Sequence, residues 1–213
     1  MHSLLVPAIL LLGVPGVLAR AVAATAESTN PILSILTNIT GTSESLSEQA
    51  GEPMDIDLDR QYKGSVRYFV KFIQDLNRTN NNFPQLPDGL NASEQRATCN
   101  YFDRDFYRSQ TRLPNDIAAK CYSSGTKGAW CNYLVICLRA YIPILEQVER
   151  KIISLTPRCA LEQRIRMGTI RLFQGQAVVR IELGRYHRKL PFTVPAEGDG
   201  GDILKDTLGV LTG

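Results

Sequence analysis

Five cysteines are the residues of this chain whose chemistry and spacing are most informative. They are Cys99, Cys121, Cys131, Cys137 and Cys159. Cysteines can bind zinc, act as nucleophiles or form disulfides. Structural zinc sites usually draw their cysteines in close pairs such as Cys-x2-Cys, whereas nine residues separate Cys121 from Cys131 and five separate Cys131 from Cys137. No histidine is near enough in the sequence to complete a ligand set, so the spacing favours disulfides over a metal site.

Histidines and catalytic motifs offer little support for an enzyme. The two histidines are His2, next to the N-terminal apolar run, and His187, among basic residues in GRYHRKL. A Cys–His nucleophile pair would have to use His187, and no neighbouring pattern supports one. The sequence contains no G-x-S-x-G, no glycine-rich phosphate loop and no H-E-x-x-H motif. We therefore expect a protein that is not an enzyme and that binds no metal or other cofactor.

The N-terminus predicts export from the cell. Residues 1–23 contain an apolar run of about 15 residues, followed by small residues with possible cleavage sites ending at Ala19 and Ala23. The run is shorter than the roughly 20 residues that span a bilayer, and no later run is longer. We interpret it as a signal peptide of a secreted, extracellular protein without membrane insertion. In that oxidising environment the cysteines are expected to pair, leaving one over.

Three Asn-x-Ser/Thr sequons support secretion. They lie at Asn38, Asn77 and Asn91, in polar, turn-rich sequence that precedes the first cysteine. The pattern predicts a polar, glycosylated extension over residues 24–89 and a compact, cysteine-stapled domain over residues 90–190. The formal net charge of +3 favours neither nucleic acid nor a membrane surface as a partner.

Hydrophobic periodicity predicts mainly strands in the compact domain. Within residues 66–78, apolar residues at helical spacing predict one short helix in the extension. The β-branched and aromatic sequence before Pro143 predicts a strand up to about Ile142, while residues 144–155 fit a helix or a strand equally. From 164 to 183, apolar and polar residues alternate, which is typical of half-buried antiparallel strands.

The last residues complete the expected architecture. Residues 191–213 are rich in proline and glycine and are expected to form a flexible tail. The predicted fold class is therefore mainly β: a small antiparallel domain with a short N-terminal helix and flexible ends.

The order of several short motifs resembles interleukin-17 family cytokines. RLPNDIAAKC, ending at Cys121, resembles the family's Arg-Tyr-Pro…Ala-x-Cys segment, and YIPI at 141–144 resembles its Val-Pro-Ile strand start. TPRC, ending at Cys159, resembles its Pro-x-Cys segment. TIRLFQGQAVVR is similar to the last strand, but Gln176 and Val178 stand where the family has two cysteines.

This resemblance implies a fold and a function. It implies a cystine-knot-like β fold, a homodimer, and non-catalytic signalling through a cell-surface receptor. The positions of Cys99 and Cys159 match the family's inter-subunit disulfide. Cys121 and Cys131 lack their family partners, so a bridge between them, or from one of them to Cys137, would be a local substitute.

A second hypothesis remains open from the residues alone. The apolar stripe from 141 to 155 also suits a helix, and it favours a secreted interaction or effector protein with a helical core and an unknown partner.

Overall fold

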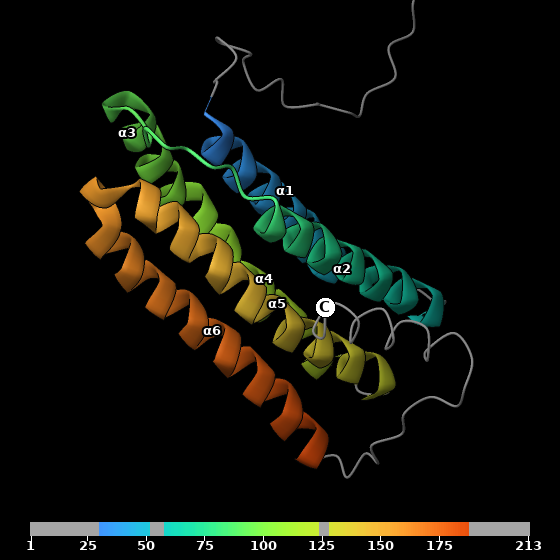
Figure 1. The fold of residues 1–213 in the computed structure, drawn as a ribbon. Coiled ribbons are helices and arrows are strands. Elements are labelled where there is room, and N and C mark those ends of the chain that lie inside the picture. The colour runs from blue at the N-terminus through green and yellow to red at the C-terminus, as the bar shows by residue number, and fades with distance from the viewer. Residues whose placement is uncertain (1–29, 52–57, 124–127, 188–213) are drawn as a thin grey trace, which may run out of the picture.

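The computed structural model describes residues 30–51, 58–123 and 128–187. The predicted signal peptide over 1–23 and the predicted tail over 191–213 lie outside the described residues. Within these ranges the chain is helical and has no β-strand (Figure 1). Its elements are α1 (Pro31–Gly51), α2 (Leu58–Asn81), α3 (Ala92–Tyr101), the π-helix η1 (Phe102–Phe106), α4 (Tyr107–Ser123), α5 (Gly128–Leu155), the 3-10 helix η2 (Pro157–Cys159) and α6 (Ala160–His187). The prediction of a mainly β, cystine-knot-like domain is therefore wrong.

The five long helices form a bundle. Around its circumference α1 contacts α4, α4 contacts α6, α6 contacts α5, α5 contacts α2, and α2 contacts α1. The arrangement has α1 and α2 on one side, α4 and α5 in the middle, and α6 on the other side, where it forms the edge of the bundle in Figure 1. Consequently α6 packs on α4 and α5 with one face only.

The first two helices are integral to this core. Ile32 and Leu36 of α1 and Phe69 and Ile73 of α2 are buried in the same apolar cluster as the later helices. The helix expected over 66–78 lies within α2, toward its C-terminal end. The boundary expected at residue 90 therefore does not separate an outer extension from the packed domain.

A loop and a side-chain cap set the start of α3. Gly89 has φ 69°, a left-handed conformation that suits glycine, just before the helix. The Asn91 side-chain oxygen accepts hydrogen bonds from the backbone N–H groups of Ser93 (2.9 Å) and Glu94 (3.0 Å). The Glu94 carboxylate in turn accepts from the Asn91 N–H (2.9 Å), which completes a capping box.

The segment around Pro143 is helix α5 throughout. The strand expected up to Ile142 is wrong, and residues 144–155 are helical. Pro143 has no N–H to donate to the carbonyl of Arg139, four residues earlier. Because Pro143 is exposed, that carbonyl faces the solvent side of the helix. The β-branched residues before it are tolerated because tertiary packing stabilises the helix: Val135, for example, is almost fully buried.

The segment 164–183, expected as strands, is also helical and belongs to α6. Consecutive residues of a helix turn by about 100°, so side chains two positions apart point in nearly opposite directions. Met167 is buried at 4% exposure, whereas Ile165 is 63% exposed. Alternation of this kind arises here because α6 has apolar residues on two opposite faces.

The centre of the bundle combines aromatic packing with a polar network. The Tyr141 ring of α5 lies 5.7 Å from that of Phe69 and 5.3 Å from that of Phe72, measured between centroids. Its hydroxyl donates to the side-chain oxygen of Gln110 in α4. The Gln110 amide nitrogen donates to Ser43 of α1 (2.9 Å), so three helices share one buried network.

No helix among the described residues is long and apolar enough to cross a membrane.

Candidate functional site

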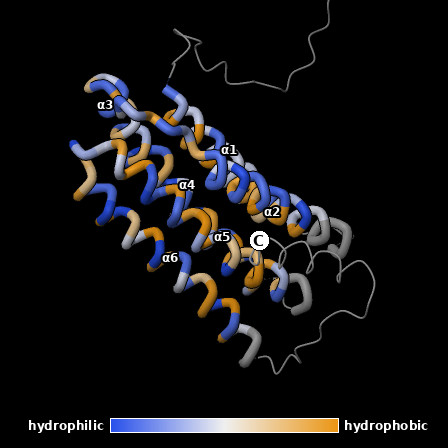
Figure 2. Tube along the Cα trace, viewed as in Figure 1, coloured by the Kyte–Doolittle hydropathy of each residue, from blue (hydrophilic) through white to orange (hydrophobic). Residues whose placement is uncertain are grey.

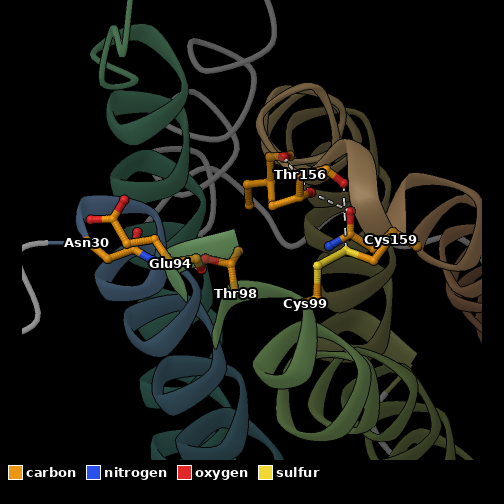
Figure 3. Close-up of a disulfide and its surroundings, with 8 residues drawn as sticks. Asn30, Glu94, Thr98, Cys99, Thr156 and Cys159 are labelled. Atoms are coloured by element: carbon orange, nitrogen blue, oxygen red, sulfur yellow. Dashed lines mark hydrogen bonds between the residues drawn. A yellow bond between two sulfur atoms is a disulfide. The ribbon is translucent and has the colours of Figure 1, made fainter. Parts of the chain in front are cut away.

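The first disulfide ties together one end of the bundle. Cys99 of α3 and Cys159 of η2 are bonded, with Cα atoms 6.1 Å apart. At the same end, Asn30 donates to the Thr98 hydroxyl (3.0 Å), so the start of α1 is held to α3 beside the bond (Figure 3). Both sulfurs are used within the chain. Neither sulfur is therefore left for the inter-subunit link implied for Cys99 and Cys159, and the homodimer itself stays a prediction.

The second disulfide joins Cys121, near the end of α4, to Cys131, near the start of α5, with Cα atoms 5.6 Å apart. This is one of the local bridges that the sequence left open. Cys137 is buried in α5 and belongs to neither disulfide. Within the described ranges no group of three or more His, Cys, Asp or Glu side chains is placed to hold a metal ion.

The sequons occupy three different helical positions. Asn38 is exposed on α1, Asn77 is half-buried on α2, and Asn91 is the exposed N-cap of α3. Their glycosylation stays a prediction. None of the three lies on α6.

The outer face of α6 holds most of the large exposed apolar side chains of the described residues. It carries exposed apolar side chains along most of its length, and Figure 2 shows hydrophobic and hydrophilic segments recurring along this helix at the edge of the bundle. Five of the six large exposed apolar residues within the described ranges are on α6. We call these the outer stripe: Leu161, Ile165, Leu172, Val179 and Leu183.

The spacing of the outer stripe makes it continuous. Ile165, Leu172 and Val179 are seven residues apart, a repeat that keeps side chains near one line along a helix. Gly168 and Gly175 lie between them, exposed, and a Cβ atom at either position would have open space within 4 Å. The stripe therefore has shallow gaps between its apolar side chains, which a partner's side chains can enter.

The charge on α6 is positive. The helix has five arginines against two glutamates. Glu182 pairs with Arg139, and Arg166 pairs with Asp103 of η1 at 2.7 Å. Arg164 and Arg180 make no ion pair among the described residues. The exposed Glu162, beside Leu161, makes none either, so the border of the outer stripe is basic overall but has one carboxylate near the start of α6.

A cavity lies between α5 and α6 beside the stripe. Its volume is about 390 Å³, and it is lined by Arg150, Ile153, Ser154, Arg164, Met167 and Arg171. Glu146 pairs with Arg150 and, at 2.9 Å, with Arg171. This one carboxylate pairs with two of the three guanidinium groups that line the cavity, so the cavity keeps a positive charge.

A buried carboxyl group lies on the same helix as this carboxylate. Glu149 of α5 is 1% exposed, and its Oε1 atom has no hydrogen-bond partner within the described structure. Burial raises the pKa of Glu149 to about 8, Arg171 lowers it and Glu146 raises it further. The Glu149 side chain is therefore mostly protonated at neutral pH and does not neutralise the arginines.

The sequence reasoning missed this surface. Alternation over residues 164–183 places the apolar residues at 165, 172, 179 and 183 on the buried face of strands together with those at 167, 170, 177 and 181. A helical plot of the same residues would have separated them into two faces. No local sequence pattern indicates the cavity, because Arg150 is brought beside Arg164 and Arg171 only by the turn between α5 and α6.

Comparison with protein families, with curated proteins and with solved structures finds no match to this chain. A function is therefore inferred from the geometry of α6 and of the cavity.

Proposed function

We propose that this chain is a secreted interaction protein with a helical core, and that it binds a partner protein through the outer stripe of α6. The observation that carries the proposal is the row of five exposed apolar side chains on one helix face. A face of this kind is typical of a protein–protein contact, because apolar surface gains free energy when it leaves water.

The charges around the stripe favour one class of partner. Arg164 and Arg180 border it without carboxylate partners among the described residues, so an apolar surface with acidic groups is complementary to it. A second copy of the chain would place one arginine-rich helix against another. The partner that we propose is therefore an extracellular protein with an acidic, apolar surface, and a cell-surface receptor is one protein of this class.

The rigidity of the bundle supports a binding role without catalysis. One disulfide joins α3 to η2 and the other joins the end of α4 to the start of α5, so α6 rests on a pre-organised platform. No conformational ordering of the bundle is needed for α6 to present its outer stripe.

Site-specific photo-cross-linking tests this proposal. A photoreactive amino acid replaces Leu172 in the full secreted chain, and a second version carries it at Arg67, an exposed position of α2, which packs on the far side of the bundle. Each is presented to intact cells and extracellular fluid. We expect one partner protein to link through position 172 and not through 67, and the same purified partner to bind the wild-type chain. A product of twice the chain's mass would assign the face to the predicted homodimer instead, and no product at 172 would overturn the proposal.

A further inference from the structure

The cavity between α5 and α6 is lined by positively charged side chains, whereas the outer stripe is apolar. Its positive donors are the guanidinium groups of Arg150, Arg164 and Arg171. The Ser154 hydroxyl donates to the carbonyl of Lys151 at 2.7 Å, so its hydrogen is already used. Each guanidinium has five N–H donors, so those of Arg150 and Arg171 retain several after pairing with Glu146.

Part of the cavity wall is apolar. Ile153 and Met167 are both at least nine-tenths buried and contribute to its lining. The volume of about 390 Å³ is larger than a single sulfate or phosphate group requires. The cavity therefore suits an anionic group that is attached to an apolar body.

We propose that this cavity is a binding site for an oxyanion ester. Such a ligand has a sulfate or phosphate group esterified to an aromatic or aliphatic body. The oxyanion accepts from Arg164 and Arg171 on α6 and from Arg150 on α5, while the apolar body lies against Ile153 and Met167. Arginine suits this task because its planar fork donates two parallel hydrogen bonds to such a group.

The site adjoins the outer stripe. Arg164 and Arg171 are each followed in the sequence by a residue of the stripe, Ile165 and Leu172. An oxyanion on the proposed partner would therefore enter the cavity while the partner's apolar side chains cover the stripe. This location rests on the proposed function, whereas binding of a small oxyanion ester to the cavity does not depend on it.

Titration of the full secreted chain with phenyl sulfate tests the site. The Met167 methyl group, observed by nuclear magnetic resonance, reports on occupancy from inside the cavity. We expect a saturable shift with a dissociation constant of about 1 mM, as is ordinary for a ligand of this size. Inorganic sulfate should bind more weakly because it lacks the apolar body, and benzyl alcohol should give no saturable shift.

Two arginines provide a matched pair of variants. Arg164→Gln removes a cavity guanidinium that has no ion pair among the described residues, so the fold should be retained, and binding should weaken at least fivefold. Arg180→Gln changes the charge of the same helix equally but lies outside the cavity lining, and binding should change less than twofold. Equal losses in both variants, equal binding of benzyl alcohol, or tighter binding of benzoate than of phenyl sulfate would overturn the assignment.

The outcomes separate the two proposals. Loss of phenyl sulfate binding with an intact cross-link at position 172 overturns the cavity site alone. Retained phenyl sulfate binding without a cross-link overturns the proposed partner alone.

Discussion

Cys99 and Cys159 are 60 residues apart in the sequence and are joined by a disulfide that fastens α3 to the turn between α5 and α6. The bond closes a chain segment that includes all of α4 and α5. It therefore holds in place the turn from which α6 starts, and it connects the stability of the bundle to the position of the outer stripe.

The two disulfides should differ in their contribution to stability. In the chain-entropy description, closing a 60-residue segment stabilises by about 4 kcal/mol and a 10-residue segment by about 3 kcal/mol. We expect the Cys99→Ser/Cys159→Ser chain to lose more free energy of unfolding than the Cys121→Ser/Cys131→Ser chain, as measured by urea denaturation. A reducible dimer linked through Cys159 in the wild-type protein would contradict the intrachain pairing.

Stability should fall with rising pH because of Glu149. Its carboxyl group would ionise near pH 4.5 in the unfolded chain, while burial raises its pKa to about 8 in the folded chain. Between these values the folded state holds a proton that the unfolded state has released, so this group lowers the free energy of unfolding by at most about 1.4 kcal/mol for each pH unit.

Glu149→Gln should remove this dependence. We expect the variant to gain stability relative to wild type as pH rises from about 5 to 8, when both are compared by denaturant unfolding. A difference between the two chains that does not change with pH would show that Glu149 is ionised in the folded state.

The buried Tyr141 hydroxyl should be necessary for full stability. Tyr141→Phe leaves the Gln110 oxygen without its donor inside the bundle, and an unsatisfied buried acceptor costs about 1–3 kcal/mol. The half-buried Tyr101 provides a control, since the structure gives its hydroxyl no hydrogen bond among the described residues, and Tyr101→Phe should change stability by less than about 0.5 kcal/mol. Equal unfolding midpoints for both variants would argue against the network.

Asn91 should have two separable roles. Asn91→Ala removes the N-cap of α3 and should cost about 1 kcal/mol, whereas Asn91→Asp keeps a side-chain oxygen at the cap and should cost little. Both changes remove the sequon. Unglycosylated protein from bacteria would isolate the cap effect, and a mass shift between wild type and Asn91→Asp from a secreting eukaryotic cell would reveal the glycan. Equal stability of the alanine and aspartate variants would contradict the capping role.

Some of these features could be predicted from the sequence, because they depend on local pattern. Val66, Phe69 and Ile73 are close enough in the sequence to reveal a helix, and all three are buried in α2. The spacing of Cys121 and Cys131 allowed a local bridge, which the structure contains.

Other features depend on tertiary packing and left no distinct local signal. Ile165 and Met167 look like one face of a strand when only alternation is considered, yet they lie on opposite faces of α6. The β-branched residues before Pro143 have strand propensity, but burial between neighbouring helices overrides it. The resemblance to interleukin-17 cytokines implied strands through both segments, and the helical bundle does not share that architecture.

The most direct test of the account is the affinity of the cross-linked partner for three purified chains: wild type, Leu172→Glu and Arg67→Glu. Leu172 is 59% exposed, so its replacement should leave the fold intact. The account predicts that Leu172→Glu weakens binding at least tenfold, because it places a charge in the centre of the outer stripe, and that Arg67→Glu changes binding less than twofold. Equal affinity of wild type and Leu172→Glu would contradict the claim that the outer stripe of α6 is the binding surface.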